Sequence, residues 1–108
     1  MSDYFLIESR DPFECADVHA QCELALGLSQ AGHRVRMFLV QNGVLPARRG
    51  ARANGLSALL NAGIPVLADE QSLRERGIRP AALVDGINPA PLELVVDALA
   101  AGSRVLWH

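Results

Sequence analysis

The sequence predicts an α/β protein, a three-layer α/β/α sandwich around a five-stranded parallel sheet. Short apolar runs rich in β-branched or aromatic residues alternate with helical patterns along the whole chain. A helical segment separates each run from the next, and parallel strands require a connection of this kind. The chain has 108 residues and is 50% hydrophobic. We therefore expect a single domain over residues 1–108.

The first strand and the first helix are predicted from a short stretch near the beginning of the chain. The apolar run at residues 4–7 predicts a strand that ends there or at Glu8. Asp11 is interpreted as the N-cap of a helix over residues 12–31, with Pro12 as its first residue and Glu14 completing a capping box. Such a helix start points free backbone N–H groups beyond the edge of the sheet.

The other elements follow from similar patterns, with glycine and proline marking their ends. We expect strands at residues 35–40, 64–68, 81–84 and 104–107, helices at 55–62, 70–76 and 89–101, and a long loop or irregular helix start at 45–54. Asp69 or Glu70 is expected to cap the helix that follows the third strand. The order of the strands in the sheet does not follow from this pattern.

A binding region is expected at the carboxyl edge of the sheet, where ligands of parallel α/β proteins bind. The predicted strand ends are followed by polar residues, which are Glu8, Ser9, Arg10, Gln41, Asn42, Asp69, Glu70, Asp85 and Asn88. Among them we select a set of candidate binding residues: Ser9, Arg10, Gln41, Asn42 and Asp85. The alternative interpretation is that these side chains only cap helices and solvate loops.

The first predicted helix carries two apolar stripes on roughly opposite sides. They consist of Cys15, Val18, Cys22, Ala25 and Leu26, and of Phe13, Ala16, Ala20, Leu24 and Leu28. One stripe covers the sheet, and a second subunit is the simplest cover for the other. We therefore expect a homo-oligomer, or a hetero-oligomer with related subunits.

Composition excludes several classes of function. The formal net charge of −2 and the pI near 5.8 do not fit a dedicated nucleic-acid-binding protein. No apolar run approaches the roughly 20 residues that span a bilayer, so we expect no membrane partner and a cytoplasmic location. All 10 Lys and Arg residues are Arg, which excludes a Schiff-base or P-loop lysine.

The two cysteines are not expected to form a disulfide. Seven residues of helix separate Cys15 from Cys22 by roughly 10 Å, beyond the limit of about 7 Å for disulfide-bonded Cα atoms.

Cys15 lies near the expected helix start and Arg10, an environment that favours thiol reactivity; the alternative is a packing role. His19 shares a helix face with both cysteines. Their spacing and the missing fourth ligand do not favour metal binding, so we predict no metal and no cofactor.

The order of these segments resembles the DsrE-like sulfur-relay family, which includes DsrE, DsrF, DsrH and the TusB, TusC and TusD proteins. Nearly the whole chain takes part in the resemblance. The matching stretches are residues 5–7 leading to Pro12, 31–35, 38–44, 63–66, 73–78, 101–102 and 105–107. The resemblance implies a doubly wound five-stranded sheet and an oligomer with helices at its interfaces. In some members it also implies a cysteine that carries persulfide sulfur between partner proteins.

The family cysteine has no counterpart at its usual position in this chain. In active members it lies just after the third strand, eight residues before the glycine of an Arg-Gly-Ile segment, and Asp69 stands there in this sequence. A carboxylate cannot accept or hand on sulfur. The chain is thus expected to be a subunit that transfers no sulfur, or one that uses another thiol, for which Cys15 is the candidate.

Three hypotheses for the function remain open at this stage. The first is an oligomeric DsrE-like protein that binds a partner protein, including a sulfur-transfer protein, or a small ligand at the strand ends. The second is an enzyme that uses Glu8, Asp69 and Asp85 with Arg10 on a small polar substrate. The third is a purely architectural subunit.

Overall fold

The sheet has five parallel strands, as predicted, and its order is β4-β3-β2-β1-β5. This computed structural model describes residues 2–52 and 54–108. The strands are β1 (Asp3–Glu8), β2 (Arg34–Leu39), β3 (Val66–Asp69), β4 (Ile87–Ala90) and β5 (Arg104–Trp107). The helices are α1 (Asp17–Gln30), α2 (Leu56–Asn61), α3 (Glu70–Glu75) and α4 (Glu93–Ala100), with 3₁₀ segments η1 (Gln41–Ala47) and η2 (Pro80–Ala82).

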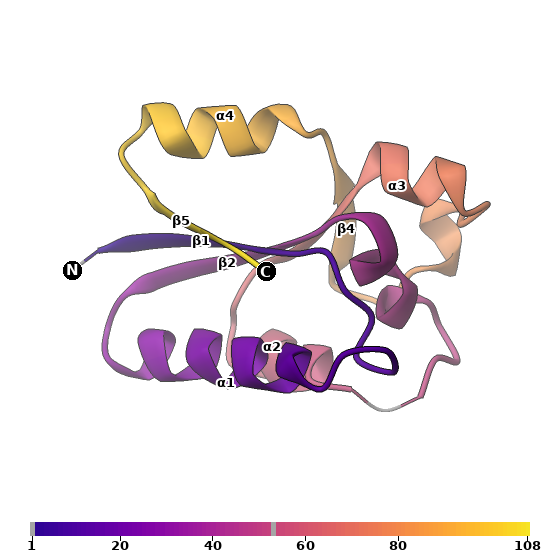
Figure 1. The fold of residues 1–108 in the computed structure, drawn as a ribbon, viewed down its shortest axis with the longest axis horizontal. Coiled ribbons are helices and arrows are strands. Elements are labelled where there is room, and N and C mark those ends of the chain that lie inside the picture. Colours follow the sequence, from indigo (N-terminus) through magenta and orange to yellow (C-terminus); the bar gives the residue numbers. More distant parts are fainter. Residues whose placement is uncertain (1, 53) are drawn as a thin grey trace.

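Helices cover both faces of the sheet, which confirms the three-layer arrangement. In Figure 1, α4 lies above the sheet, and α1 and α2 lie below it. The helix α3 lies at the end of the sheet to which β3 leads, beside η1. The loops beyond β1, β2 and β3 therefore gather at one end of the molecule, whereas the beginning of β1 lies at the other end.

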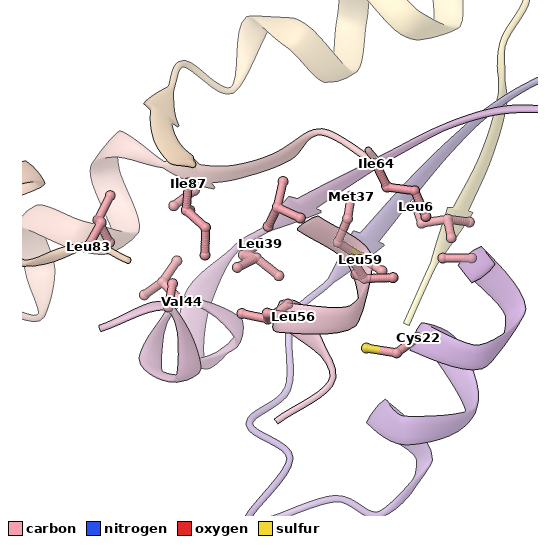
Figure 2. Close-up of a cluster of buried hydrophobic side chains, with 14 of the residues drawn as sticks. Leu6, Cys22, Met37, Leu39, Val44, Leu56, Leu59, Ile64, Leu83 and Ile87 are labelled. Carbon is pink, nitrogen blue, oxygen red and sulfur yellow. The ribbon is translucent and has the colours of Figure 1, made fainter. Parts of the chain in front are cut away.

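Two apolar clusters form the core, one on each face. The larger cluster packs β2 residues such as Met37 and Leu39 against α1 and α2, and Cys22 belongs to it (Figure 2). The smaller one joins Phe5 and Phe38, both fully buried, to Ala98 of α4. Consecutive β1 residues thus pack into opposite layers, because successive side chains of a strand point to opposite faces.

The first helix begins later than expected. Helix α1 begins at Asp17, and Ala16 rather than Asp11 is its N-cap. The carboxylate of Asp11 accepts a hydrogen bond from the Phe13 N–H, and its carbonyl accepts from the N–H groups of Glu14 and Cys15. An Asp-Pro pair suits such a turn as well as it suits a helix start. Cys15 therefore lies in the turn before α1 rather than in its first turn.

The fourth strand is also displaced from its predicted position. Residues 80–82 form η2, and Leu83 makes only an isolated antiparallel bridge to Arg48. The strand is β4, Ile87–Ala90, which takes Pro89 away from the predicted fourth helix, so that α4 begins at Glu93. β4 is an edge strand, where a proline needs no ladder partner for its missing N–H.

The predicted stripes on the first helix have different environments. Val18, Cys22 and Ala25 of the first stripe are buried against the sheet, whereas Phe13 and Leu24 of the second are 54% and 43% exposed. Among the residues that the structure describes, none belongs to a helix of sufficient length and apolar character to span a membrane.

Candidate functional site

Strand order creates a switch point between β1 and β5. From β1 the chain adds β2, β3 and β4 on one side and then returns to place β5 on the other side of β1. In open α/β sheets, ligands bind beyond the carboxyl ends of strands at such a point. The first residues beyond β1 and β5 are therefore the first place to look for a site.

Backbone hydrogen bonds hold the residue after β5 beside the end of β1. The His108 N–H donates to the Ile7 carbonyl at 2.8 Å, and the Ser9 N–H donates to the His108 carbonyl at 2.9 Å. The Ser9 hydroxyl donates to the same carbonyl at 2.8 Å. Ser9, a predicted binding residue, thus fixes the position of His108 and has its hydroxyl hydrogen engaged.

His108 forms a close pair with a buried carboxylate. Its Nδ1 lies 2.9 Å from both carboxylate oxygens of Glu8, whose side chain is 3% exposed. The Arg10 backbone N–H donates to the same carboxylate at 3.1 Å. Because a carboxylate accepts hydrogen bonds, it holds the proton of His108 on Nδ1 and leaves Nε2 for another partner.

Cys15 and Asp17 complete this group, which we call the β1–β5 corner: Glu8, Arg10, Cys15, Asp17 and His108. Cys15 is half-buried, and its Sγ lies 3.9 Å from Nη1 of Arg10. The Cys15 Sγ, a carboxylate oxygen of Asp17 and a ring nitrogen of His108 all lie within 4.8 Å of one another. A thiol, an imidazole and a carboxylate that orients the imidazole are the components of a nucleophilic cysteine site.

The second cysteine lies in the core and is a poor nucleophile. Cys22 is 6% exposed and packs below β1. Burial raises its pKa from 9.0 to about 11, and the nearby charge of Glu8 adds to the increase. The thiol of Cys22 therefore stays protonated at neutral pH, and thiol chemistry in this chain depends on Cys15.

Asp69, which the resemblance places at the position of the family cysteine, serves as a helix cap. Its carboxylate accepts the backbone N–H of Ser72 at 3.0 Å and the Ser72 hydroxyl at 2.7 Å, which begins α3. The Ser72 Oγ in turn accepts the Gln41 N–H at 2.8 Å. Asp69 is 6% exposed. Both hydrogen bonds from Ser72 go to Oδ2, which is thus engaged inside the fold.

Most of the other predicted binding residues lie at the same edge but have structural partners. Gln41 is exposed and adopts a φ of 51°, and Asn42 accepts hydrogen bonds from Nε and Nη2 of Arg76 at 3.2 and 3.0 Å. A hollow of about 320 Å³ beyond β3 and β4 is lined by Asp69 and by residues of α3 and of the start of α4. Arg10 is exposed and belongs to the β1–β5 corner.

The expectation that Asp85 follows the fourth strand is wrong. Asp85 precedes β4 by two residues, and its carboxylate forms an exposed ion pair with Nη2 of Arg49 at 2.6 Å. The reason is the displaced strand. Asp85 would follow a strand at 81–84 and lie at the carboxyl edge, but it precedes the strand at Ile87–Ala90 and so lies at the amino end of that strand. Asp85 therefore drops out of the group at the strand ends.

Sequence reasoning missed His108 and Asp17 as members of a site. Their contact depends on the neighbour relation of β1 and β5, which nothing in the local sequence pattern encodes. The one available signal was the end of the last predicted strand, which in a parallel sheet lies at the same edge as Glu8.

The five-stranded doubly wound sheet with a half-buried thiol near its switch point defines the class: a small α/β protein with a candidate thiol site at the carboxyl edge. Residues 2–107 match the DsrE/DsrF-like family, so the chain belongs to that family. No curated protein matches the sequence closely enough to add to this assignment.

Solved structures with the same fold come from distant organisms. The ychN protein from E. coli superposes with a TM-score of 0.89 at 20% identity, covering 100% of both chains. MTH1491 from Methanobacterium thermoautotrophicum, a protein of unknown function, gives 0.83 at 19% identity, with 99% of this chain and 98% of that chain covered. BT1422 from Bacteroides thetaiotaomicron gives 0.78 at 18%, with 98% and 95% covered. These likenesses establish the fold.

Proposed function

We propose that this chain is an oligomeric protein of the sulfur-relay type that binds a sulfur-transfer protein or a small sulfur donor at the carboxyl edge of its sheet. In this proposal Cys15 is the sulfur carrier, and Asp69 is a structural cap at the position of the family cysteine. The observation that carries the proposal is the grouping of Cys15, His108 and Glu8 at the β1–β5 corner.

The chemistry of loading is a transfer of sulfane sulfur without net oxidation. The Cys15 thiol gives its proton to Nε2 of His108, and the thiolate attacks the terminal sulfur of a donor persulfide. A new S–S bond forms on Cys15 while the donor's S–S bond breaks. The inner sulfur of the donor leaves as a thiolate and takes the proton from His108. Glu8 orients the imidazole and stabilises its charged form during the step.

The oligomeric part of the proposal is supported by apolar residues that the fold leaves exposed. Leu92, the N-cap of α4, is 54% exposed, and Val96 and Leu99 on the helix are 65% and 59% exposed, while Ala98 of the same helix is buried. Trp107 on the edge strand β5 is 62% exposed. Large apolar side chains that remain exposed beside one another are typical of a surface covered within an assembly.

A reducing compartment suits this function. The structure holds Cys15 and Cys22 as free thiols, and free thiols persist in the cytoplasm. We therefore place the protein there.

The enzyme alternative loses two of the four side chains on which it relied. Asp69 Oδ2 is engaged by Ser72, and Asp85 lies away from the strand ends beside Arg49, whereas Glu8 and Arg10 remain together at the β1–β5 corner. The architectural alternative becomes a possible outcome of the loading experiment described next.

Intact-mass spectrometry after incubation with a small persulfide donor tests the proposal. We expect the wild-type protein and Cys22→Ala to gain the mass of one sulfur atom, which a reductant removes, and Cys15→Ser to gain none. His108→Ala should slow loading by about 100-fold or more, because it removes the general base. The matched control His19→Ala alters an exposed histidine of α1 and should load at the wild-type rate.

Two outcomes contradict the proposal. Loading that persists in Cys15→Ser would move the carrier to Cys22. No loading of the wild-type protein by any persulfide donor would leave the chain as a binding or architectural subunit without sulfur chemistry.

A further inference from the structure

We propose that Cys15, Asp17 and His108 bind one divalent transition-metal ion of the zinc type, with Glu8 positioning the histidine. This site differs from the group of Cys15, His19 and Cys22 on one helix face, which the sequence did not favour as a metal site. Cys15 and Asp17 come from the turn before α1 and from its first residue, and His108 comes from the end of β5. The proposal goes beyond sulfur transfer and does not depend on it.

The distances suit a metal site after small side-chain movements. The three potential ligand atoms lie within 4.8 Å of one another. A tetrahedral zinc ion with bonds of about 2.0–2.3 Å brings its ligand atoms to about 3.3–3.8 Å from each other. Side-chain rotations that bring the three atoms closer together close the difference. Asp17 is exposed, and Cys15 and His108 are only half-buried, so the side chains have room to move.

Glu8 supplies the outer partner that metal-binding histidines require. A metal-bound imidazole almost always donates its other N–H to a carboxylate, a carbonyl or water, which fixes the ring and its tautomer. The Nδ1 of His108 already lies 2.9 Å from both oxygens of the buried Glu8 carboxylate. The Nε2 is consequently the nitrogen left for the ion. This buried carboxylate distinguishes the β1–β5 corner from a chance cluster of surface groups.

The donor set and the local charge select the kind of ion. A thiolate and an imidazole favour Zn²⁺ over Mg²⁺ or Ca²⁺, which prefer oxygen ligands. With the thiolate formed, Cys15, Asp17 and Glu8 carry three negative charges, and Arg10, 3.9 Å from Cys15, carries one positive charge. These four side chains together carry a net charge of −2, which balances the charge of a divalent cation. Three protein ligands leave a fourth position open, as in zinc sites that bind an exogenous ligand.

Metal titration of the purified, metal-free protein tests this inference. Co²⁺ serves as the spectroscopic probe, and Zn²⁺ is then added as a competitor. We expect a cobalt–thiolate charge-transfer band with tetrahedral d–d bands, which Zn²⁺ abolishes at one equivalent. Zn²⁺ should also slow the alkylation of Cys15 by iodoacetamide.

Four variants separate the proposed ligands from their surroundings. Asp17→Asn changes an exposed side chain and should lose the tetrahedral cobalt spectrum with the fold intact. His108→Ala should lose it as well, and Glu8→Gln should weaken Zn²⁺ binding by about 10- to 100-fold. His19→Ala is the matched control and should bind like the wild type.

The inference is overturned if no thiolate band forms, or if Asp17→Asn and His108→Ala bind metal like the wild type. It is also overturned if His19→Ala abolishes binding, because the histidine ligand would then be His19 of α1 rather than His108. Persulfide loading, measured on metal-free protein, gives an independent result. Loading without metal binding would support the proposed function and refute the metal site. Metal binding without loading would support the metal site and refute sulfur transfer.

Discussion

Gly43 has no room for a side chain. A Cβ atom at this position would collide with the backbone carbonyl oxygen of Glu8, which accepts the Val40 N–H at 3.0 Å. The glycine therefore lets η1 approach the end of β1 and supports the position of Glu8.

Gly43→Ala should lower the free energy of unfolding by about 3 kcal/mol, the upper end of the range for overpacked sites, because backbone atoms must separate. The matched control is Gly27→Ala in α1, where a Cβ meets nothing within 4 Å. It should raise stability by up to about 1 kcal/mol. Urea denaturation measures both, and equal effects of the two substitutions would disprove the close approach.

Asp69 contributes to stability as the cap of α3. Asp69→Ala should cost about 1–2 kcal/mol, because the N–H and the hydroxyl of Ser72 lose their acceptor. Asp69→Asn keeps one carbonyl oxygen and should cost less. Chemical denaturation distinguishes the two, and an equal loss in both variants would mean that the charge, rather than the cap, is what matters.

Cys22 makes stability depend on alkaline pH. In the folded protein its pKa is raised to about 11, whereas the ordinary value is 9.0. The unfolded chain thus releases the proton first as pH rises, and stability decreases between pH 9 and 11, while it is fully retained below pH 9. The loss should reach about 3 kcal/mol. The absence of lysine keeps this pH window free of lysine titration.

Urea denaturation below pH 9 and near pH 11 measures this effect. Cys22→Ala should be less stable but should lose the part of the alkaline decline that comes from this thiol. Cys15→Ser should keep that part. A wild-type protein whose stability is unchanged between these pH values would contradict the assignment.

At the scale of elements, local sequence signals placed most strands correctly. They failed where the same residues are typical of two different local structures, such as a turn and a helix start. The runs that became β1, β2 and β5 are apolar and lie where they were expected, within a residue or two. Asp11 and Pro12 formed a turn, because an Asp side chain accepts an N–H two residues on as readily in a turn as at a helix start.

The fourth strand shows how an edge position overrides residue preference. Residues 81–84 are more apolar than Ile87–Ala90, which contains Asn88 and Pro89. β4 pairs only with β3, so Pro89 can sit in the strand with its missing N–H toward the open edge. Edge strands need few apolar side chains, and a search for apolar runs overlooks them.

For the whole molecule, oligomerisation should depend on α4 more than on the second stripe of α1. We propose an assembly that buries this face, so Val96→Glu combined with Leu99→Glu should give a monomer in sedimentation velocity, because the charges would be buried at the interface. Leu24→Glu on α1 is the matched test of the surface that the sequence indicated. A wild-type protein that sediments as a monomer at micromolar concentration would refute both surfaces.

The candidate site could be predicted from the sequence only in part. Ser9, Arg10, Gln41, Asn42 and Asp69 were correctly expected at the carboxyl edge, because they follow strands whose ends were recognised. Their hydrogen-bond partners were not predictable. Asp69 pairs with Ser72 and Asn42 with Arg76, contacts that depend on how α3 and η1 pack together.

The sequence by itself determined the alternation of strands and helices, and with it the parallel sheet, the layered architecture and the family, because periodicity and turn residues act over a few positions. Only the tertiary structure decided that β5 pairs with β1. That pairing brings His108 to Glu8 and within reach of Cys15. Strand order depends on the packing of whole layers, so no local pattern could reveal that residues about a hundred positions apart share a carboxylate–imidazole pair.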